Sequence, residues 1–260
     1  MKLTPELSRH NYRAFLWHSI WLALAKNFMD VDTVIPAMLV ESGGRAVHIG
    51  LITAIMLGGS SFTQLFFAPL LSNRPYKKKS LLLGINARIL ALLGLAVLMV
   101  YAGQLPQQLT LILIFGLIIV FSLGGAFAGI SYTDILGKSI QQNLRKPFFS
   151  VRQVIMGIGA FASALLVQIV LTSSSYPANY TYMLLIGFLA LLLASMGFWR
   201  LQEMLPSELT IRSTQHFFQV AREELDQNPR LKYFLGFVNT QGISIAFLPF
   251  VILYAKEFFD

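Results

Sequence analysis

Long apolar stretches alternate with short polar turns along most of the chain. Seven of these stretches reach the ~20 residues that a helix needs to cross a membrane. They lie at about residues 14–40, 48–71, 80–103, 108–131, 148–172, 180–201 and 232–255. The pattern predicts an all-α membrane protein with seven transmembrane helices.

One sizeable hydrophilic segment, residues 202–231, separates the sixth apolar stretch from the seventh. Within it Phe217, Val220, Ala221, Glu224 and Leu225 recur at helical spacing. We expect an amphipathic helix here, lying on the inner membrane surface and ending at Asn228 and Pro229. The segment would link two membrane units.

The composition agrees with a membrane protein and excludes several kinds of site. Of 260 residues, 55% are hydrophobic and 12% charged, and the mean hydropathy is +0.64, which is too apolar for a soluble domain. The chain has no cysteine, which excludes disulfides, thiolate metal sites and cysteine nucleophiles. Its four histidines are scattered, and no phosphate-binding GxxxxGK sequence occurs. We therefore expect no metal site, no cofactor and no catalytic residue.

The basic residues gather on one side of the predicted membrane. The formal net charge is +8, and most lysines and arginines fall before the first stretch or in the turns after the second, fourth and sixth. By the positive-inside rule these turns are cytoplasmic, and so is the N-terminus. The charge is thereby explained without nucleic acid. The first stretch is too long for a signal peptide, so we expect it in the mature protein of the cytoplasmic (inner) membrane.

The first stretch, residues 15–40, carries charged residues through its middle. In one continuous helix Lys26, Asp30 and Thr33 would share a face, with Asp32 on the opposite side and a kink at Pro36. An ionised side chain at mid-membrane costs roughly 2.5–3.5 kcal/mol on insertion scales, so such residues normally line a cavity. We predict a substrate or ion cavity here. The alternative is that Lys26 and Asp30 pair and merely hold the bundle together.

Two further arginines lie inside predicted helices. Arg88, in the third stretch, could extend to the interface or face the bundle interior as a partner for a carboxylate. Arg152, a turn inside the fifth stretch, could close onto Asp134, which also stands four residues before Lys138. Such a contact would form a latch that breaks in another conformation, or a plain surface pair of little energy. Gly125 and Gly129 have the spacing of small residues at helix contacts.

Several stretches resemble the major facilitator superfamily of transporters. The sequence FMDVDTVIPAMLVESGG followed by HIGLITAIMLGGSSFTQLFFAPLLS is similar to the opening of that family, and NPRLKYFLGFVNTQGISIAFLPFVILYA looks like a seventh helix. The turn NRPYKK, residues 73–78, occupies the place of the family's G-x-x-x-D-R-x-G-R-K signature. Asn73 replaces the aspartate there, while Arg74, Lys77 and Lys78 keep the charges. Together with Asp134, Lys138 and Arg152 they are the candidate cytoplasmic gate.

The resemblance implies two six-helix halves, a site at mid-membrane and alternating access by rocking. The expected domains are an N-terminal half over 1–201, a linker over 202–231 and the first helix of a truncated second half over 232–260. The rest of that half is then an expected partner. Superposing Pro36 on Pro249 sets Asn239 opposite Lys26, so Asn239 and Gln241 join Arg88, Asp32 and Thr33 as candidate cavity residues.

The sequence therefore favours a secondary transporter that moves a small solute across the lipid bilayer. Coupling to protons is a further hypothesis, motivated by the carboxylates of Asp30 and Asp32. Two alternatives stay open, namely a non-transporting membrane partner or remnant subunit, and an intramembrane enzyme, which the scattered histidines disfavour.

Overall fold

The computed structural model describes residues 3–207, 213–245, 250–251 and 254–255, and this part of the chain is helical, without strands. The elements are α1 (Pro5–Phe28), α2 (Val34–Glu41), α3 (Ala46–Thr53), the π-helix η1 (Ala54–Gly59), α4 (Ser60–Ser72), α5 (Lys78–Tyr101), α6 (Gln107–Ser139), α7 (Gln142–Ser173), α8 (Ala178–Arg200), α9 (Thr214–Gln227) and α10 (Pro229–Ile245). Five helices of this part are long and apolar enough to cross a membrane: Ala46–Ser72, α5, α6, α7 and α8. The chain is a multi-pass, all-α membrane protein.

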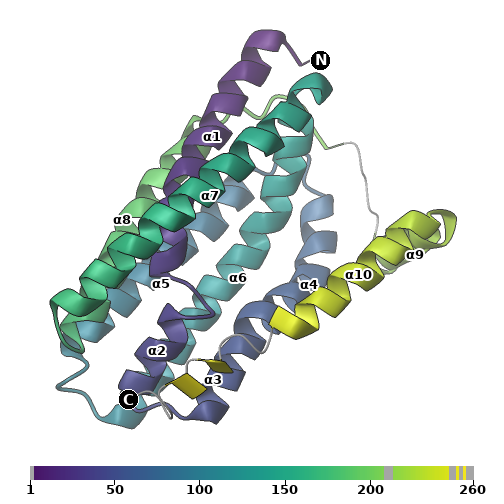
Figure 1. Ribbon diagram of the computed structural model, residues 1–260. Helices are drawn as coiled ribbons and strands as arrows, with labels where there is room; N and C mark the ends of the chain where they lie inside the picture. Colours follow the sequence, from purple (N-terminus) through teal and green to yellow (C-terminus); the bar gives the residue numbers. More distant parts are fainter. Residues whose placement is uncertain (1–2, 208–212, 246–249, 252–253, 256–260) are drawn as a thin grey trace.

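The long helices form one bundle with a fixed order of neighbours (Figure 1). Helix α1 packs between α7 and α8, α5 packs between α8 and α6, and α4 lies against α6. Helices α5 and α6 approach each other closely. A Cβ on Gly84 would lie 2.6 Å from the carbonyl oxygen of Gly124, so these two backbones touch.

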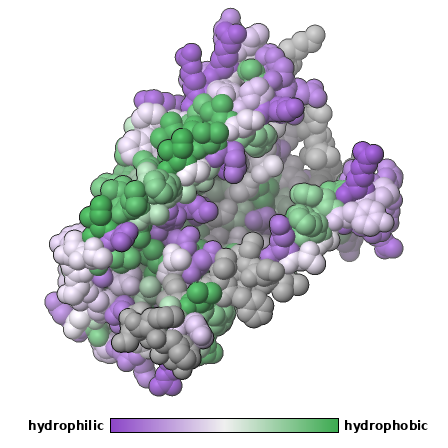
Figure 2. Space-filling view, in the orientation of Figure 1, coloured by the Kyte–Doolittle hydropathy of each residue, from purple (hydrophilic) through white to green (hydrophobic). Residues whose placement is uncertain are grey.

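Apolar side chains also cover the outside of the bundle. Figure 2 shows a hydrophobic band along α7, where Ile158 and Phe161 are 67% and 72% exposed. Helix α4 likewise exposes Phe62 and Phe66. Such a surface is stable against lipid or another apolar helix but not against water.

The first predicted helix differs from the expectation of one continuous helix kinked at Pro36. Helix α1 begins at Pro5 and ends at Phe28, and residues 29–33 form turns before α2. The cause is local, because Asp30 Oδ1 accepts hydrogen bonds from the backbone N–H of Asp32 (3.0 Å) and the hydroxyl of Thr33 (2.9 Å). Aspartate side chains compete in this way with helical hydrogen bonds.

The break lies at mid-height of the bundle. A Cβ on Gly187, the tenth residue of the 23-residue α8, would contact Phe28 Cβ at 3.2 Å. Since Lys26 belongs to α1 and Thr33 is the N-cap of α2, Lys26, Asp30 and Thr33 do not form one helical face.

The segment after α8 is held against the start of the bundle. Asn11 and Gln202 exchange two hydrogen bonds of 2.9 Å, from the Asn11 amide to the Gln202 carbonyl and from the Gln202 N–H to the Asn11 side chain. Further on, α9 ends at Gln227 with Asn228 as its C-cap, and Pro229 begins α10. This is where the sequence predicted the linker helix to stop. Figure 1 shows α9 and α10 beside the bundle.

Candidate functional site

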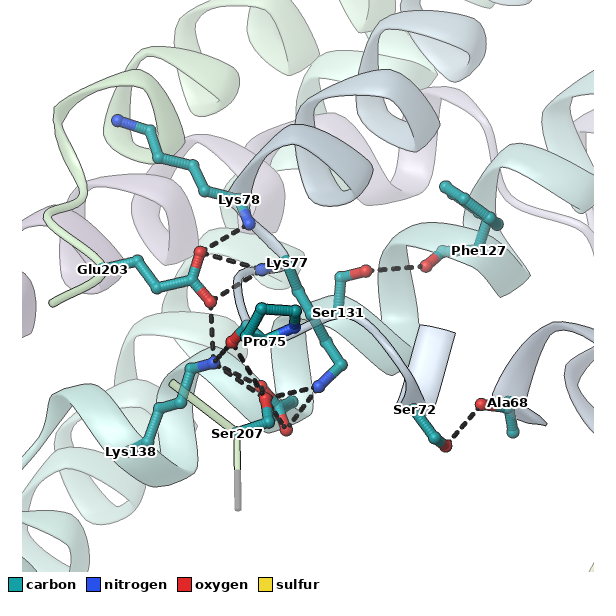
Figure 3. Close-up of polar contacts among 11 residues, drawn as sticks. Ala68, Ser72, Pro75, Lys77, Lys78, Phe127, Ser131, Lys138, Glu203 and Ser207 are labelled. Atoms are coloured by element: carbon teal, nitrogen blue, oxygen red, sulfur yellow. Dashed lines mark hydrogen bonds and ion pairs between the residues drawn. The ribbon is translucent and has the colours of Figure 1, made fainter. Parts of the chain in front are cut away.

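Four charged side chains and one hydroxyl meet where the turn after α4 reaches the segment that follows α8 (Figure 3). We call this group the charge cluster, and its members are Lys77, Asp134, Lys138, Glu203 and Ser207. Asp134 lies 3.0 Å from Lys77 Nζ and 2.9 Å from Lys138 Nζ. Lys138 Nζ also lies 2.7 Å from Glu203. Two cations and two anions thus neutralise one another.

The charge cluster is largely withdrawn from water. The side chains of Lys77 and Glu203 are only 4% and 3% exposed, against 13% for Lys138 and 28% for Asp134. The Ser207 hydroxyl donates to Asp134 at 2.9 Å and accepts from Lys138 Nζ at the same distance. A buried charge that loses its partner is strongly destabilising, so the cluster fixes how these segments meet.

Glu203 also forms the N-terminal cap of α5. Its carboxylate accepts hydrogen bonds from the backbone N–H groups of Lys77 (2.8 Å) and Lys78 (2.7 Å). These donors have no partner within the helix, and a negative charge is favoured at a helix N-terminus. Glu203 and Ser207 were missed by sequence reasoning. The available signal was an acidic residue directly after the sixth helix, on the same predicted side as the basic turn.

The candidate gate residues separate into three groups. Lys77, Asp134 and Lys138 meet in the charge cluster, and Lys78 joins it through its backbone while its ammonium donates to the carbonyls of Trp199 and Leu201. Asn73 and Arg74 lie on the exposed turn. Arg152 does not pair with Asp134 in the part of the chain that the structure describes, because Lys77 and Lys138 occupy that carboxylate.

A second polar feature lies inside the bundle. One cavity of about 150 Å³ lies between α1, α5, α6, α7 and α8, and another of about 220 Å³ adjoins it near η1 and α4. They share Arg88 and Gly125, and we call them together the arginine cavity. Its other lining residues are His18, Leu22, Met56, Ser60, Leu81, Ile85, Phe121, Ser122, Ala128, Gly129, Tyr132, Arg152 and Phe198.

Arg88 lies at the centre of the arginine cavity. It is the eleventh residue of the 24-residue α5, about 15 Å from the start of that helix. Its guanidinium carbon lies 4.2 Å from the centre of the Phe121 ring, a cation–π contact. A Cβ on Gly125 would lie 3.6 Å from the same guanidinium. Arg88 therefore faces the bundle interior, but none of the described carboxylates pairs with it, so the carboxylate partner that the sequence offered for Arg88 is not present.

Three polar groups of the arginine cavity have no hydrogen-bond partner although their atoms are buried. They are Nε of Arg88, Nε of Arg152 and the hydroxyl of Tyr132. His18, by contrast, has contacts with α8: its Nδ1 lies 3.2 Å from the Ala194 carbonyl oxygen, and its ring stacks on the Phe198 ring with 3.8 Å between the centres. Buried polar groups are normally paired, so these donors require an explanation.

The wall near η1 has an unusual backbone. Residues 54–59 form a π-helix within the longer helix from Ala46 to Ser72. The carbonyl of Ile55 accepts both the N–H of Ser60 and, at 2.9 Å, the hydroxyl of Ser122 on α6. Single π turns recur at functional sites, and this one borders the arginine cavity.

The other predicted cavity residues lie elsewhere. Lys26 is exposed, and no ion pair joins it to Asp30 within the described residues. Asp32 has a buried oxygen without a hydrogen-bond partner. Asn239 and Gln241 are exposed on α10, and Pro249, on which their selection depended, lies outside the described residues. None of these residues lines the arginine cavity.

No group of three histidine, aspartate or glutamate side chains that could hold a metal ion occurs among the described residues. Comparison of the chain with models of protein families and with curated proteins finds no match.

Proposed function

We propose that the chain is a secondary transporter of the major facilitator type, or the larger part of one, that moves a small solute across the cytoplasmic membrane by alternating access. The observation that carries the proposal is the arginine cavity. Two cationic side chains line a space at mid-height of a membrane bundle, where ionised groups are costly and are retained for substrate or ion pathways.

The interrupted first helix supports the same function. Non-helical backbone at membrane depth is tolerated only where protein covers it or where it lines a cavity. Transporters use such broken helices to form their substrate and ion sites. The break at residues 29–33 holds Asp30 and Asp32, which remain the candidates for binding a proton or another coupling cation.

In this proposal the charge cluster is the cytoplasmic latch. It joins the turn after α4, the end of α6 and the segment after α8, which are all cytoplasmic if the N-terminus is. Domain 1–201 would be the N-terminal half, and the exposed faces of α4 and α7 would meet a second half across the substrate path.

The absence of cysteine makes alternating access directly testable. Gly129→Cys places one thiol in the arginine cavity, because nothing lies within 4 Å of a Cβ at that position. Gly103→Cys, between α5 and α6, and Tyr76→Cys, in the turn after α4, mark the two membrane faces. A membrane-impermeant maleimide is applied to intact cells and to inside-out vesicles.

We expect Gly103→Cys to react only in intact cells, Tyr76→Cys only in inside-out vesicles, and Gly129→Cys in both. Labelling of Gly129→Cys from one face alone, or from neither, would refute alternating access and favour a non-transporting membrane partner.

A further inference from the structure

The arginine cavity contains positive charge without a matching negative charge. Arg88 and Arg152 both line it, and no carboxylate of the described residues does. The carboxylate nearest to either arginine along the sequence is that of Asp134, and it already pairs with Lys77 and Lys138 in the charge cluster. Neither arginine forms an ion pair within the described residues. A pair of half-buried arginines that only held helices together would be expected to contact carboxylates or carbonyls.

The side chain of Arg88 is held in place by groups that leave its N–H donors free. The guanidinium carbon lies over the face of the Phe121 ring, 4.2 Å from its centre, and a Cβ on Gly125 would lie 3.6 Å from the guanidinium. A guanidinium has five N–H donors, and no hydrogen bond from Arg88 to another described residue is present. The donors are thus fixed in position and open to a ligand.

We propose that the arginine cavity binds the anionic group of a small soluble solute, a carboxylate or a phosphate, between Arg88 and Arg152. The hydroxyl of Tyr132, buried without a partner, supplies a third donor. This inference rests on the proposed function and names the substrate class of the same site.

Carboxylates and phosphates match the geometry of the donors. The planar fork of an arginine binds two oxygens of such a group at once, which a spherical anion cannot reproduce. The cavity has room for a small anion, since each of its two parts is several times larger than the ~30 Å³ that a water molecule takes in the liquid. Gly125 and Gly129 keep this space open, because a side chain at Gly129 would extend into it.

The arrangement has a consequence for stability. Two like charges in one cavity repel each other, and partial burial removes part of their solvation. A bound anion removes both costs, so it should stabilise the protein, whereas removal of one arginine should leave the ligand-free protein as stable as before or more stable. A purely structural arginine would have the opposite effect on the ligand-free protein.

The test measures thermal unfolding of the purified full chain in detergent at constant ionic strength in chloride, with four probes. They are inorganic phosphate, succinate, neutral glucose and the anionic lipid phosphatidylglycerol. The variants are Arg88→Gln, Arg88→Lys and Arg152→Gln, with Arg13→Gln as the matched control, because Arg13 is exposed on α1.

We expect phosphate or succinate to raise the melting temperature of the wild type and of Arg13→Gln by ~5–10 °C at ~100 times the Kd, and glucose to have no effect. Arg88→Gln and Arg152→Gln should bind the anion about tenfold more weakly or worse. Without anion they should melt no lower than the wild type. Arg88→Lys should keep the fold and part of the binding, because it keeps the charge but not the fork.

Several results would overturn the inference. They are equal anion stabilisation of the wild type and Arg88→Gln, no effect of either soluble anion, or an arginine-dependent effect of phosphatidylglycerol alone. Loss of stability in the ligand-free glutamine and lysine variants alike would assign the arginines a structural role. The two proposals fail separately. If the anions bind but Gly129→Cys is labelled from one face only, the anion site stands and transport is refuted. If Gly129→Cys is labelled from both faces but no anion binds, transport stands and this substrate class is refuted.

Discussion

Removal of the Glu203 carboxylate should destabilise the protein much more than removal of any exposed acid. In Glu203→Ala the backbone N–H groups of Lys77 and Lys78 lose the acceptor that lies 2.8 and 2.7 Å away. Lys138 loses one of its two carboxylate partners. Because Glu203 is 3% exposed, water cannot easily replace these contacts.

The size of the effect follows from the contacts that remain. Breaking a buried ion pair by removing one partner costs about 3–5 kcal/mol. Lys138 keeps Asp134 and the Ser207 hydroxyl, so we expect the lower end, about 3 kcal/mol. For a chain of this size that lowers the melting temperature by roughly 6–12 °C. Glu203→Gln keeps an oxygen acceptor for the N–H groups but loses the charge, so we expect about half the effect.

The assay is thermal unfolding of the purified protein in detergent micelles, followed by tryptophan fluorescence. The matched control is Glu223→Ala on α9, where an exposed carboxylate accepts one hydrogen bond from Gln219. Such a pair within one helix contributes at most ~0.5 kcal/mol. If Glu203→Ala and Glu223→Ala melted at the same temperature as the wild type, the cap and the buried charge pairing would both be wrong.

Three further predictions concern the helix contacts, the helix break and proton coupling. Gly84→Ala should lower stability by about 1–3 kcal/mol because its Cβ would lie 2.6 Å from the Gly124 carbonyl, whereas Gly116→Ala, with nothing within 4 Å, should have little effect in the same melting assay. Asp30→Ala should cost about 1–2 kcal/mol by removing the acceptor of two hydrogen bonds, and Asp30→Asn should retain most of the stability. If Asp32 takes up the coupling proton, Asp32→Asn should abolish the pH dependence of solute uptake, and an unchanged pH profile would exclude that role.

The charge cluster shows where residue patterns alone were sufficient. The favourable spacing of Asp134 and Lys138 identified a pair that the structure contains, because residues four apart on a helix are neighbours whatever the tertiary fold. The predicted partner Arg152 was not found there, since α7 is rotated so that Arg152 lines the arginine cavity. The contribution of Glu203 depends on the path of the chain after α8, which no local spacing reveals.

The first helix shows a different limit. Apolar length predicted a continuous span over residues 15–40, but the side chain of Asp30 satisfies nearby donors and ends the helix earlier. The sequence placed a kink at Pro36, but the helix is interrupted before that residue. Pro36 lies in the first turn of α2, where a proline is tolerated.

The sequence by itself determined that this is an all-α membrane protein and that the helix after residue 213 ends at Asn228 and Pro229. Both follow from properties that act within a few turns of one chain segment, namely apolar length, periodicity and the missing N–H of proline. Only the tertiary structure decided that Arg88, Arg152 and Tyr132 share a cavity while Lys26 does not. Such a meeting depends on the rotation of each helix about its axis, which is fixed by close contacts between distant segments, such as Gly84 against Gly124.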